Sequence, residues 1–372
     1  MASKTFAYVL SVVLFSFLLQ LHSSAGQTVV KGVYWFPGSG FPVSGIDSTL
    51  FTHIFCAFAD LNSTTYQVTI SSSNSAQFST FTQTVQQKNP SVKTLLSIGG
   101  GSSSPSTFAS MASQASTRKS FIDSSIQLAR SFKFHGLDLD WEYPSTSTEM
   151  NSLGLLLNEW RAAVAKEASS TRNTTLLLAA AFFYTSNYYT LNYPFQAISN
   201  SLDWVNVMAY DFYGPSWQGS MNMTGPPAAL YNPRSQVSGD TGIKAWIQAG
   251  VPAKKLALGL PFYGYAWRLL DASKTGIFAP ANGPAISPDG SQTYSQIRDL
   301  ITQSGYIKVY NSTFVTNYCY NGLTWIGYDD TESIFTKVTY AKAKGLLGYF
   351  AWNVGADKNF TLAKNASSTW GP

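Results

Sequence analysis

One stretch of the sequence decides the fold: Gly136-Leu-Asp-Leu-Asp-Trp-Glu-Tyr-Pro144. Its three acids, Asp138, Asp140 and Glu142, alternate with apolar residues. Successive side chains of a β-strand point to opposite faces, so a strand here would carry the acids on one face and the apolar residues on the other. Burying carboxylates without partners is costly, and we therefore interpret the acidic row as functional rather than as packing.

Short apolar, β-branched or aromatic runs recur on both sides of this stretch, and helical patterns separate most of them. Continuous apolar runs are typical of parallel strands whose two faces are both buried. The predicted strands are Val29–Trp35, His53–Ala59, Lys93–Ile98, Gly136–Trp141, Leu176–Phe183, Trp204–Tyr210, Leu256–Tyr263 and Leu346–Trp352. The predicted helices include Ser104–Phe132, Glu149–Ser170, Thr241–Ala249 and Thr331–Ala343.

Eight units of strand followed by helix predict an α/β fold, the (β/α)8 TIM barrel, over residues 26–372. The competing fold, a doubly wound open sheet, lacks its Gly-rich dinucleotide fingerprint after the first strand. Polar, Gly/Pro-rich sequence with short β-like pieces interrupts the rhythm after Trp267. We therefore expect a small α+β insertion at residues 268–322, after strand seven and on the side where active-site loops emerge.

Composition excludes several classes of protein. Aromatic residues make up 15% of the 372 residues and charged residues only 12%, which excludes a disordered chain. The net charge of +5 comes without any basic run, so no nucleic-acid partner is expected. The surplus of aromatic rings indicates that some of them line a binding surface.

The N-terminus predicts a signal peptide at residues 1–25. Lys4 precedes the apolar segment Phe6–Leu21, which is shorter than the ~20 residues of a membrane span and so argues against a signal anchor. No later stretch is apolar for long enough to span a bilayer. We expect a secreted protein without a membrane partner, extracellular or apoplastic, with the vacuole as the other destination.

Secretion would permit glycosylation and disulfide formation. Beyond residue 25 the chain has only Cys56 and Cys319, too few for a disulfide scaffold, and a single bridge between them stays open. The sequons for N-glycosylation are Asn62, Asn173, Asn222, Asn311, Asn359 and Asn365.

The spacing of the acids indicates the chemistry. Side chains two apart on a strand lie about 6–7 Å apart along its axis, whereas retaining glycosidases usually place two carboxyls about 5–5.5 Å apart on either side of the scissile bond. A single row fits better with one acid that protonates the leaving oxygen while the substrate supplies the nucleophile. Asp138 and Asp140 should share a proton, and nearby negative charge should keep Glu142 protonated as a general acid.

A metal site is the alternative interpretation of the acidic row. Hard cations accept carboxylate oxygens, but one strand converges poorly on an ion and no histidine cluster lies nearby in the sequence. We therefore expect neither a metal nor a cofactor.

The sequence Phe134-His-Gly-Leu-Asp-Leu-Asp-Trp-Glu-Tyr-Pro144 resembles the signature of glycoside hydrolase family 18, the chitinases, and within it the plant class V chitinases. Further matching motifs follow in order along nearly the whole chain: Ser97-Ile-Gly-Gly100, Met208-Ala-Tyr-Asp211, Pro261-Phe-Tyr-Gly264 and Trp352. Two positions depart from the common family pattern. His135 stands where many members have Asp, and Tyr265 stands where many relatives have Arg.

The resemblance implies a role for each matching residue. Glu142 would act as general acid and then as base, and Asp140 would orient the 2-acetamido group and stabilise an oxazolinium intermediate. Asp138 would tune Asp140, and Tyr210 would donate a hydrogen bond to the acetamido carbonyl. Trp352 would form the floor under the sugar at the cleavage site. The substrate-contacting residues would be Asp211, Met208, Trp352, Tyr34, Phe58, Tyr263, Tyr265 and Trp267, with Trp217 just beyond them.

The resemblance implies a monomeric, endo-acting, retaining chitinase that cuts chitin or N-acetylglucosamine oligosaccharides. A rival from another class is a catalytically weak or inactive lectin on the same fold, which would bind such oligosaccharides without cutting them. A softer alternative is a hydrolase specialised for lipo-chitooligosaccharides or for peptidoglycan.

Overall fold

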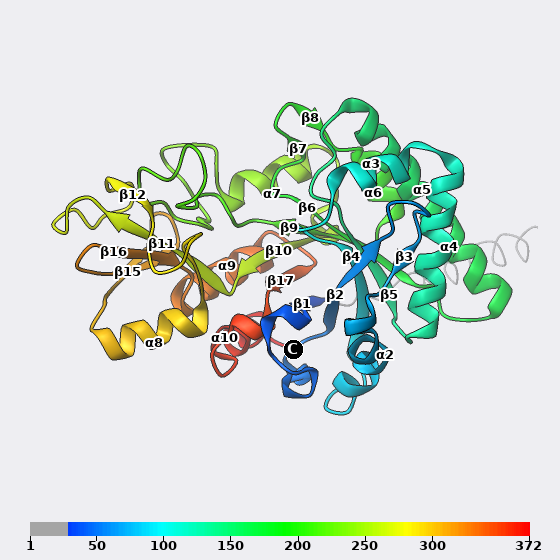
Figure 1. Ribbon diagram of the computed structural model, residues 1–372, viewed down its shortest axis with the longest axis horizontal. Helices are drawn as coiled ribbons and strands as arrows, with labels where there is room; N and C mark the ends of the chain where they lie inside the picture. The colour runs from blue at the N-terminus through cyan, green and yellow to red at the C-terminus, as the bar shows by residue number, and fades with distance from the viewer. Residues whose placement is uncertain (1–28) are drawn as a thin grey trace, which may run out of the picture.

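The computed structural model describes residues 29–372, and the predicted signal peptide at residues 1–25 lies outside them. Eight parallel strands form the central sheet, in the order β1-β17-β10-β9-β6-β5-β4-β2, and it closes because β1 also pairs with β2 (Figure 1). The predicted (β/α)8 barrel is therefore confirmed. Its strands are β1 (Val30–Trp35), β2 (His53–Leu61), β4 (Lys93–Gly99), β5 (Gly136–Asp140), β6 (Leu177–Phe183), β9 (Trp204–Met208), β10 (Leu256–Pro261) and β17 (Gly348–Trp352).

Helices surround this barrel, with two departures from the predicted pattern. No α-helix separates β1 from β2, where three short 3-10 turns take its place. The predicted helix Ser104–Phe132 is two helices, because Gln114 has an extended backbone with φ −120° and ψ 143°. The helices of the barrel are α2 (Ser72–Gln86), α3 (Pro105–Ser113), α4 (Ala115–Ser131), α5 (Ser147–Thr171), α6 (Phe195–Ser201), α7 (Gly239–Gln248), α9 (Thr331–Ala343) and α10 (Thr361–Trp370).

The alternation of side chains along the strands separates two apolar layers. Leu137 and Leu139 of β5 belong to the large core between strands and helices. Tyr34, Phe55 and Phe350 belong to a second core that fills the interior of the barrel. Since side chains fill the interior, a ligand site must lie at the mouth, where the strands end.

The insertion follows β10, as predicted, and projects from one side of the barrel (Figure 1). It is an antiparallel sheet with one helix, α8 (Tyr294–Ser304). The sheet extends beyond residues 268–322 at both ends, because its first strand pairs with its last. Its strands are β11 (Tyr263–Leu269), β12 (Ala281–Pro284), β13 (Ser291–Thr293), β14 (Ile307–Asn311), β15 (Thr316–Asn321) and β16 (Thr324–Tyr328).

Three two-residue strands complete the list of elements: β3 (Val68–Thr69) on the edge of the barrel sheet, and the hairpin of β7 (Asn187–Tyr188) and β8 (Leu191–Asn192). Cys56 lies on β2 and Cys319 on β15, and both are buried free thiols, so the bridge left open by the sequence is not formed. Over residues 29–372, no helix combines the length and the apolar character needed to cross a membrane.

Candidate active site

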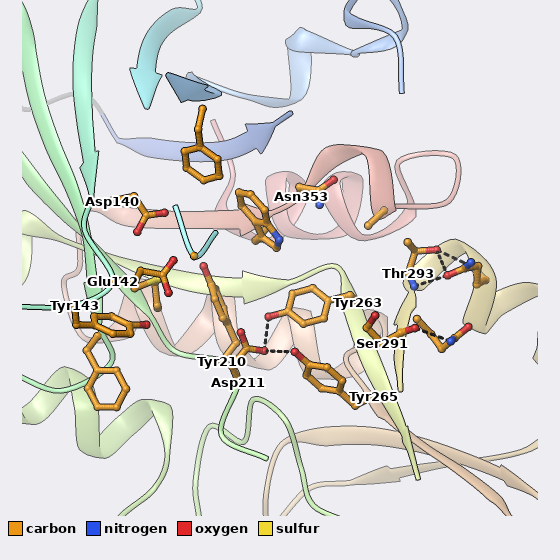
Figure 2. Close-up of a pocket in the computed structure, with 18 residues that line it drawn as sticks. Asp140, Glu142, Tyr143, Tyr210, Asp211, Tyr263, Tyr265, Ser291, Thr293 and Asn353 are labelled. Atoms are coloured by element: carbon orange, nitrogen blue, oxygen red, sulfur yellow. Dashed lines mark hydrogen bonds between the residues drawn. The ribbon is translucent and has the colours of Figure 1, made fainter. Parts of the chain in front are cut away.

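The acidic row rises from the interior of the barrel to its mouth. Asp138 on β5 is fully buried, and Asp140, the last residue of the strand, is 5% exposed. β5 ends at Asp140, one residue earlier than predicted, and Glu142 lies in the loop beyond it. There it lines a cleft together with Asp140 (Figure 2). The acids therefore form a row from the barrel interior, where Asp138 lies beneath the cleft, to the mouth, where Asp140 and Glu142 line it.

Asp138 is held by hydroxyl groups. Its Oδ2 accepts hydrogen bonds from Ser97 Oγ at 2.7 Å and from Tyr34 OH at 2.8 Å. The Tyr34 hydroxyl in turn accepts one from Asn206 Nδ2 at 2.9 Å. Burial raises the pKa of Asp138 to about 6, although the two hydroxyl donors oppose the shift.

The pKa values of Asp140 and Glu142 are both raised, which favours the protonated form of each carboxyl. Burial raises the pKa of Asp140 well above its ordinary value, and the charges of Glu142 and Asp138 raise it further. Burial also raises the pKa of Glu142, where the charge of Asp211 adds to the shift and the Tyr143 hydroxyl opposes it. The Oδ1 atoms of Asp138 and Asp140 are buried without a hydrogen-bond partner. A proton shared between these two carboxyls would give each oxygen a partner.

Glycines at the end of β4 and in the turn that follows it pack closely against the end of β5 and against Phe58. Gly99 and Gly100 have φ values of +111° and +86°, a conformation that favours glycine. A Cβ at Gly99 would lie 2.2 Å from Asp140 O, and one at Gly100 would lie 2.5 Å from the Phe58 ring. Gly99 and Gly100 therefore serve packing, while the next residue, Gly101, lines the cleft beside Glu142.

The cleft has a volume of about 600 Å³ and lies at the carboxyl ends of the barrel strands. The Trp352 ring stacks on Phe58 and on Phe36, at centroid distances of 5.6 and 5.4 Å. Six of the eight predicted substrate-contacting residues line the cleft, together with the predicted catalytic residue Tyr210: Phe58, Met208, Asp211, Tyr263, Tyr265 and Trp352.

Asp211 is the third carboxyl that lines the cleft, after Asp140 and Glu142. Its Oδ1 accepts hydrogen bonds from the hydroxyls of Tyr263 at 2.7 Å and Tyr265 at 3.0 Å, as the dashed lines of Figure 2 show. Loss of solvent raises the pKa of Asp211, and these two donors oppose the shift. Tyr265, where relatives often have Arg, thus supplies a neutral hydrogen bond to Asp211.

Two predicted contacts are wrong. Tyr34 is 2% exposed and lies below the cleft, where it binds Asp138 rather than substrate. Trp267 is fully buried, and its Nε1 donates to Ser220 O at 3.1 Å. The loop after β9 that contains Ser220 covers this side of β11 and keeps Trp267 from the cleft. Trp217 is 36% exposed and contacts Tyr265, with ring centroids 5.4 Å apart.

Sequence reasoning missed a further set of cleft residues: Gly101, Tyr143, Phe183, Ser291, Gln292, Thr293, Gln296, Asn353 and Ala356. Tyr143 stood inside the quoted acidic signature without an assigned role, and Thr293 and Gln296 have the Thr-x-x-Gln spacing of a helix capping box. His53 and His135 lie at the opposite, amino-terminal ends of β2 and β5. Within residues 29–372, no cluster of three or more His, Cys, Asp or Glu side chains could hold a metal ion.

Comparisons with known proteins agree with this geometry. The class V chitinase of Arabidopsis thaliana is 62% identical over 370 residues, which cover 99% of this chain and 96% of the relative. A mutant class V chitinase from Nicotiana tobaccum, solved in complex with NAG4, superposes with a TM-score of 0.91 at 54% identity and covers 93% of this chain and 99% of its own. The chitinase-like agglutinin RobpsCRA from Robinia pseudoacacia superposes with a TM-score of 0.86, also at 54% identity, over 92% of this chain and 100% of its own.

The family model described as "Glycosyl hydrolases family 18" matches residues 27–357. This match covers the barrel, the insertion and every residue of the acidic row. The chain therefore belongs to glycosyl hydrolase family 18.

Proposed function

We propose that the protein is an endo-acting, retaining chitinase, which hydrolyses β-1,4 links between N-acetylglucosamine units with help from the substrate's own 2-acetamido group. The observation that carries this proposal is the order of the acids from the barrel interior to its mouth. Glu142 lies beyond the end of β5 in an open cleft that Asp140, the last residue of the strand, also lines, and Asp138 is buried two residues before Asp140.

The raised pKa of Glu142 keeps a proton available for the oxygen of the scissile bond. As that bond breaks, the acetamido carbonyl oxygen attacks the anomeric carbon and forms a cyclic oxazolinium ion. Asp140, by releasing its proton toward Asp138, gains the negative charge that stabilises this cation. The Tyr210 hydroxyl lines the same cleft and is positioned to donate to the acetamido oxygen. Glu142, now ionised, then takes a proton from the water that opens the ring.

Asp211 is the other carboxyl that could act as a nucleophile, since it too lies in the cleft. Its Oδ1 already accepts two tyrosine hydroxyls, which hold the carboxylate in place and reduce its basicity. We therefore assign Asp211 a contact with the substrate and not a covalent role.

A lectin on the same barrel is the second candidate, because a relative with 54% identity is titled an agglutinin. Binding alone requires neither a general acid nor a buried pair of acids beneath it. The complete row of Asp138, Asp140 and Glu142, with Tyr210 and Asp211 in one open cleft, favours the enzyme.

The test is hydrolysis of an N-acetylglucosamine hexamer by the wild type and by Glu142→Gln. We expect the variant to lose about 10²- to 10⁴-fold in kcat, because a general acid contributes that much. Asp123→Asn is the matched control, since its side chain is 61% exposed on α4 and does not line the cleft. Equal rates for wild type and Glu142→Gln would refute the mechanism, and binding without hydrolysis by either would favour the lectin.

Secretion and the monomeric state are further proposals. The signal-like residues 1–25 support secretion, and N-terminal sequencing of the protein secreted by a plant cell should then start near Gly26. Light scattering of the secreted protein should give the mass of one chain.

A further inference from the structure

A surface hollow that shares no residue with the cleft is lined by two partly exposed aromatic rings. It has a volume of about 400 Å³ and lies between α9, α10 and β14 of the insertion. Phe335 of α9 is 53% exposed and Tyr310 of β14 is 37% exposed. Contact of apolar surface with water is unfavourable, so a hollow that gathers two such rings suits a ligand with an apolar face.

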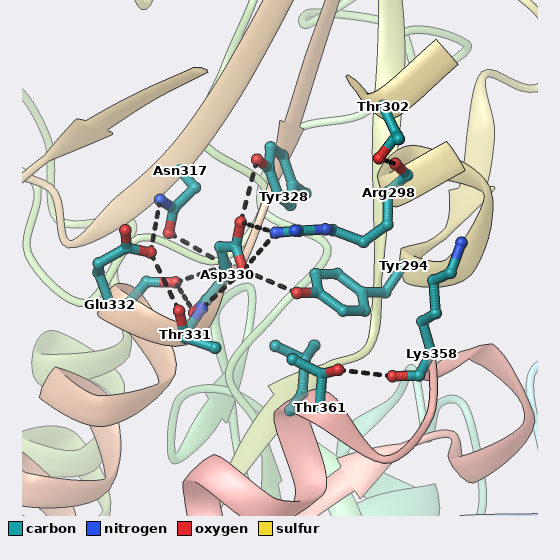
Figure 3. A network of polar contacts seen from close by, with 12 residues as sticks. Tyr294, Arg298, Thr302, Asn317, Tyr328, Asp330, Thr331, Glu332, Lys358 and Thr361 are labelled. Atoms are coloured by element: carbon teal, nitrogen blue, oxygen red, sulfur yellow. Dashed lines mark hydrogen bonds and ion pairs between the residues drawn. The ribbon is translucent and has the colours of Figure 1, made fainter. Parts of the chain in front are cut away.

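Polar contacts fix the rim of this hollow. Thr331 and Glu332, at the start of α9, belong to the network around Asp330 that Figure 3 shows. Thr331 N donates to Asp330 Oδ1 at 2.9 Å, and Thr331 Oγ1 donates to Glu332 Oε2 at 3.4 Å. A hydrogen bond of 3.2 Å joins the Tyr310 hydroxyl to Thr336 Oγ1 and ties the insertion to α9. Because these contacts hold the rim, a ligand can bind there without first ordering it.

Asn365 of α10 lines the same hollow and begins the sequon Asn365-Ala366-Ser367. Its Oδ1 is buried and has no hydrogen-bond partner among the residues that the structure describes, whereas the residue as a whole is partly exposed. With the oxygen inside, Nδ2 is the amide atom left toward the hollow. N-glycosylation joins the first sugar of a glycan to this nitrogen.

We propose that Asn365 is an N-glycosylation site whose first N-acetylglucosamine packs in the hollow against Phe335 and Tyr310. The glycan comes from a lipid diphosphate-linked oligosaccharide of the secretory pathway. The bond between its anomeric carbon and the diphosphate oxygen breaks, a bond from that carbon to Asn365 Nδ2 forms, and the amide loses one proton. This assignment rests on the proposed secretion and is independent of the proposed hydrolysis, because no residue of the hollow lines the cleft.

The attachment itself favours the packing. The first sugar is joined directly to a residue that lines the hollow, so its contact with the rings is intramolecular and needs no separate encounter. The C–H groups on one face of the sugar would cover the exposed part of Phe335. Its hydroxyl and acetamido groups would face water or the polar rim at Thr331 and Glu332.

The first test is glycopeptide mass spectrometry of the wild type secreted by plant cells. We expect a glycan on Asn365 in most molecules. Glycans at other sequons, such as Asn62, with Asn365 unmodified would overturn this site alone. A protein that keeps residues 1–25 and has no glycan at all would refute the proposed secretion together with the site.

The second test measures the packing of the sugar through melting temperatures. Asn365→Gln, Phe335→Ser and the double variant are compared with the wild type, each made in plant cells and in the bacterial cytoplasm, where no glycan is attached. In the plant-made protein, Asn365→Gln should lower the melting temperature by about 1–2 °C more than in the bacterial protein. This extra loss should vanish in the Phe335→Ser background, because the sugar then has no ring to cover.

Leu155→Ser is the matched control. Leu155 is 51% exposed on α5 and does not line the hollow, so the extra loss should persist in this background. An extra loss that also persists in Phe335→Ser, or none in the wild-type background, would overturn the packing. If light scattering showed that the unmodified chain forms a dimer which Phe335→Ser abolishes, a second copy of the chain would cover the hollow, and the proposal would be wrong.

Discussion

Asp138→Asn should make the free energy of unfolding less sensitive to rising pH. Asp138 is fully buried, and its pKa rises from 3.8 to about 6 in the folded state. Because the folded pKa lies above the unfolded one, the stability that this group contributes is present below pH 3.8 and is lost as pH rises through about 6. A difference of about two pKa units corresponds to about 3 kcal/mol of lost stability near pH 7.

The asparagine variant removes this loss with little change in packing. Its side-chain oxygen can still accept the hydroxyls of Ser97 and Tyr34, and its amide can donate where Asp138 Oδ1 now has no partner. We therefore expect the loss of stability between about pH 3 and pH 7 to be about 3 kcal/mol smaller in Asp138→Asn than in the wild type. For a chain of this length the difference corresponds to about 4 °C in melting temperature.

The assay is thermal unfolding followed by circular dichroism at both pH values. The comparison of wild type with variant at each pH cancels the titration of groups that do not interact with Asp138, and the neighbouring Asp140 is the main group that does. Asp123→Asn serves as the control for the substitution itself, because its side chain is 61% exposed on α4, outside the barrel interior. If wild type and Asp138→Asn lost the same stability between the two pH values, the proposed cost of ionising Asp138 would be refuted.

Three further predictions concern the site and its surroundings. The activity should fall as pH rises through the raised pKa of Glu142. Asp211→Asn should move this fall in activity to lower pH, and Tyr143→Phe should move it to higher pH. A pH–rate profile in which both variants shift the fall in the same direction would contradict the assigned electrostatics. Tyr34→Phe should cost about 1–3 kcal/mol in urea unfolding and lower kcat without changing KM, because its hydroxyl lies below the cleft; a higher KM would place it in contact with substrate. Trp267→Phe removes the hydrogen bond to Ser220 O and should lower the free energy of unfolding by about 1–3 kcal/mol while KM stays unchanged. A raised KM in steady-state kinetics would mean that Trp267 does contact the substrate.

The barrel and the acidic row were predictable because both follow from local sequence patterns: continuous apolar runs for the strands, and a period of two for the acids. Each barrel strand is a run of buried residues, and the period of two in Gly136–Asp140 separates Asp138 and Asp140 from Leu137 and Leu139 within five residues. Such patterns depend only on the geometry of a strand, so one sequence is enough to identify them. The cleft residues that share a family motif were predicted from the resemblance, and six of the eight predicted substrate contacts line the cleft.

What the sequence did not predict depends on contacts between distant segments. Trp267 has the same strand parity as Tyr263 and Tyr265, which do line the cleft, but the loop that contains Ser220 covers it. The cleft residues Ser291, Thr293 and Gln296 were missed because short polar side chains indicate no chemistry in the sequence until the insertion brings them to the cleft.

Backbone geometry at the mouth of the barrel was equally invisible in the sequence. The peptide bonds Ala57–Phe58, Glu142–Tyr143 and Trp352–Asn353 are cis although none precedes proline. Gln114 interrupts a helical pattern without Gly or Pro to mark the break. Periodicity and turn signals describe none of these features.

The role of the substrate as its own nucleophile can be measured with a matched pair of hexamers, one of N-acetylglucosamine and one fully deacetylated. Wild-type protein should cut the acetylated hexamer, with products first released as the β-anomer by NMR, and should leave the deacetylated hexamer intact even where it binds. Cleavage of the deacetylated hexamer at a comparable rate would mean that a carboxylate of the protein, with Asp211 the first candidate, attacks the sugar instead.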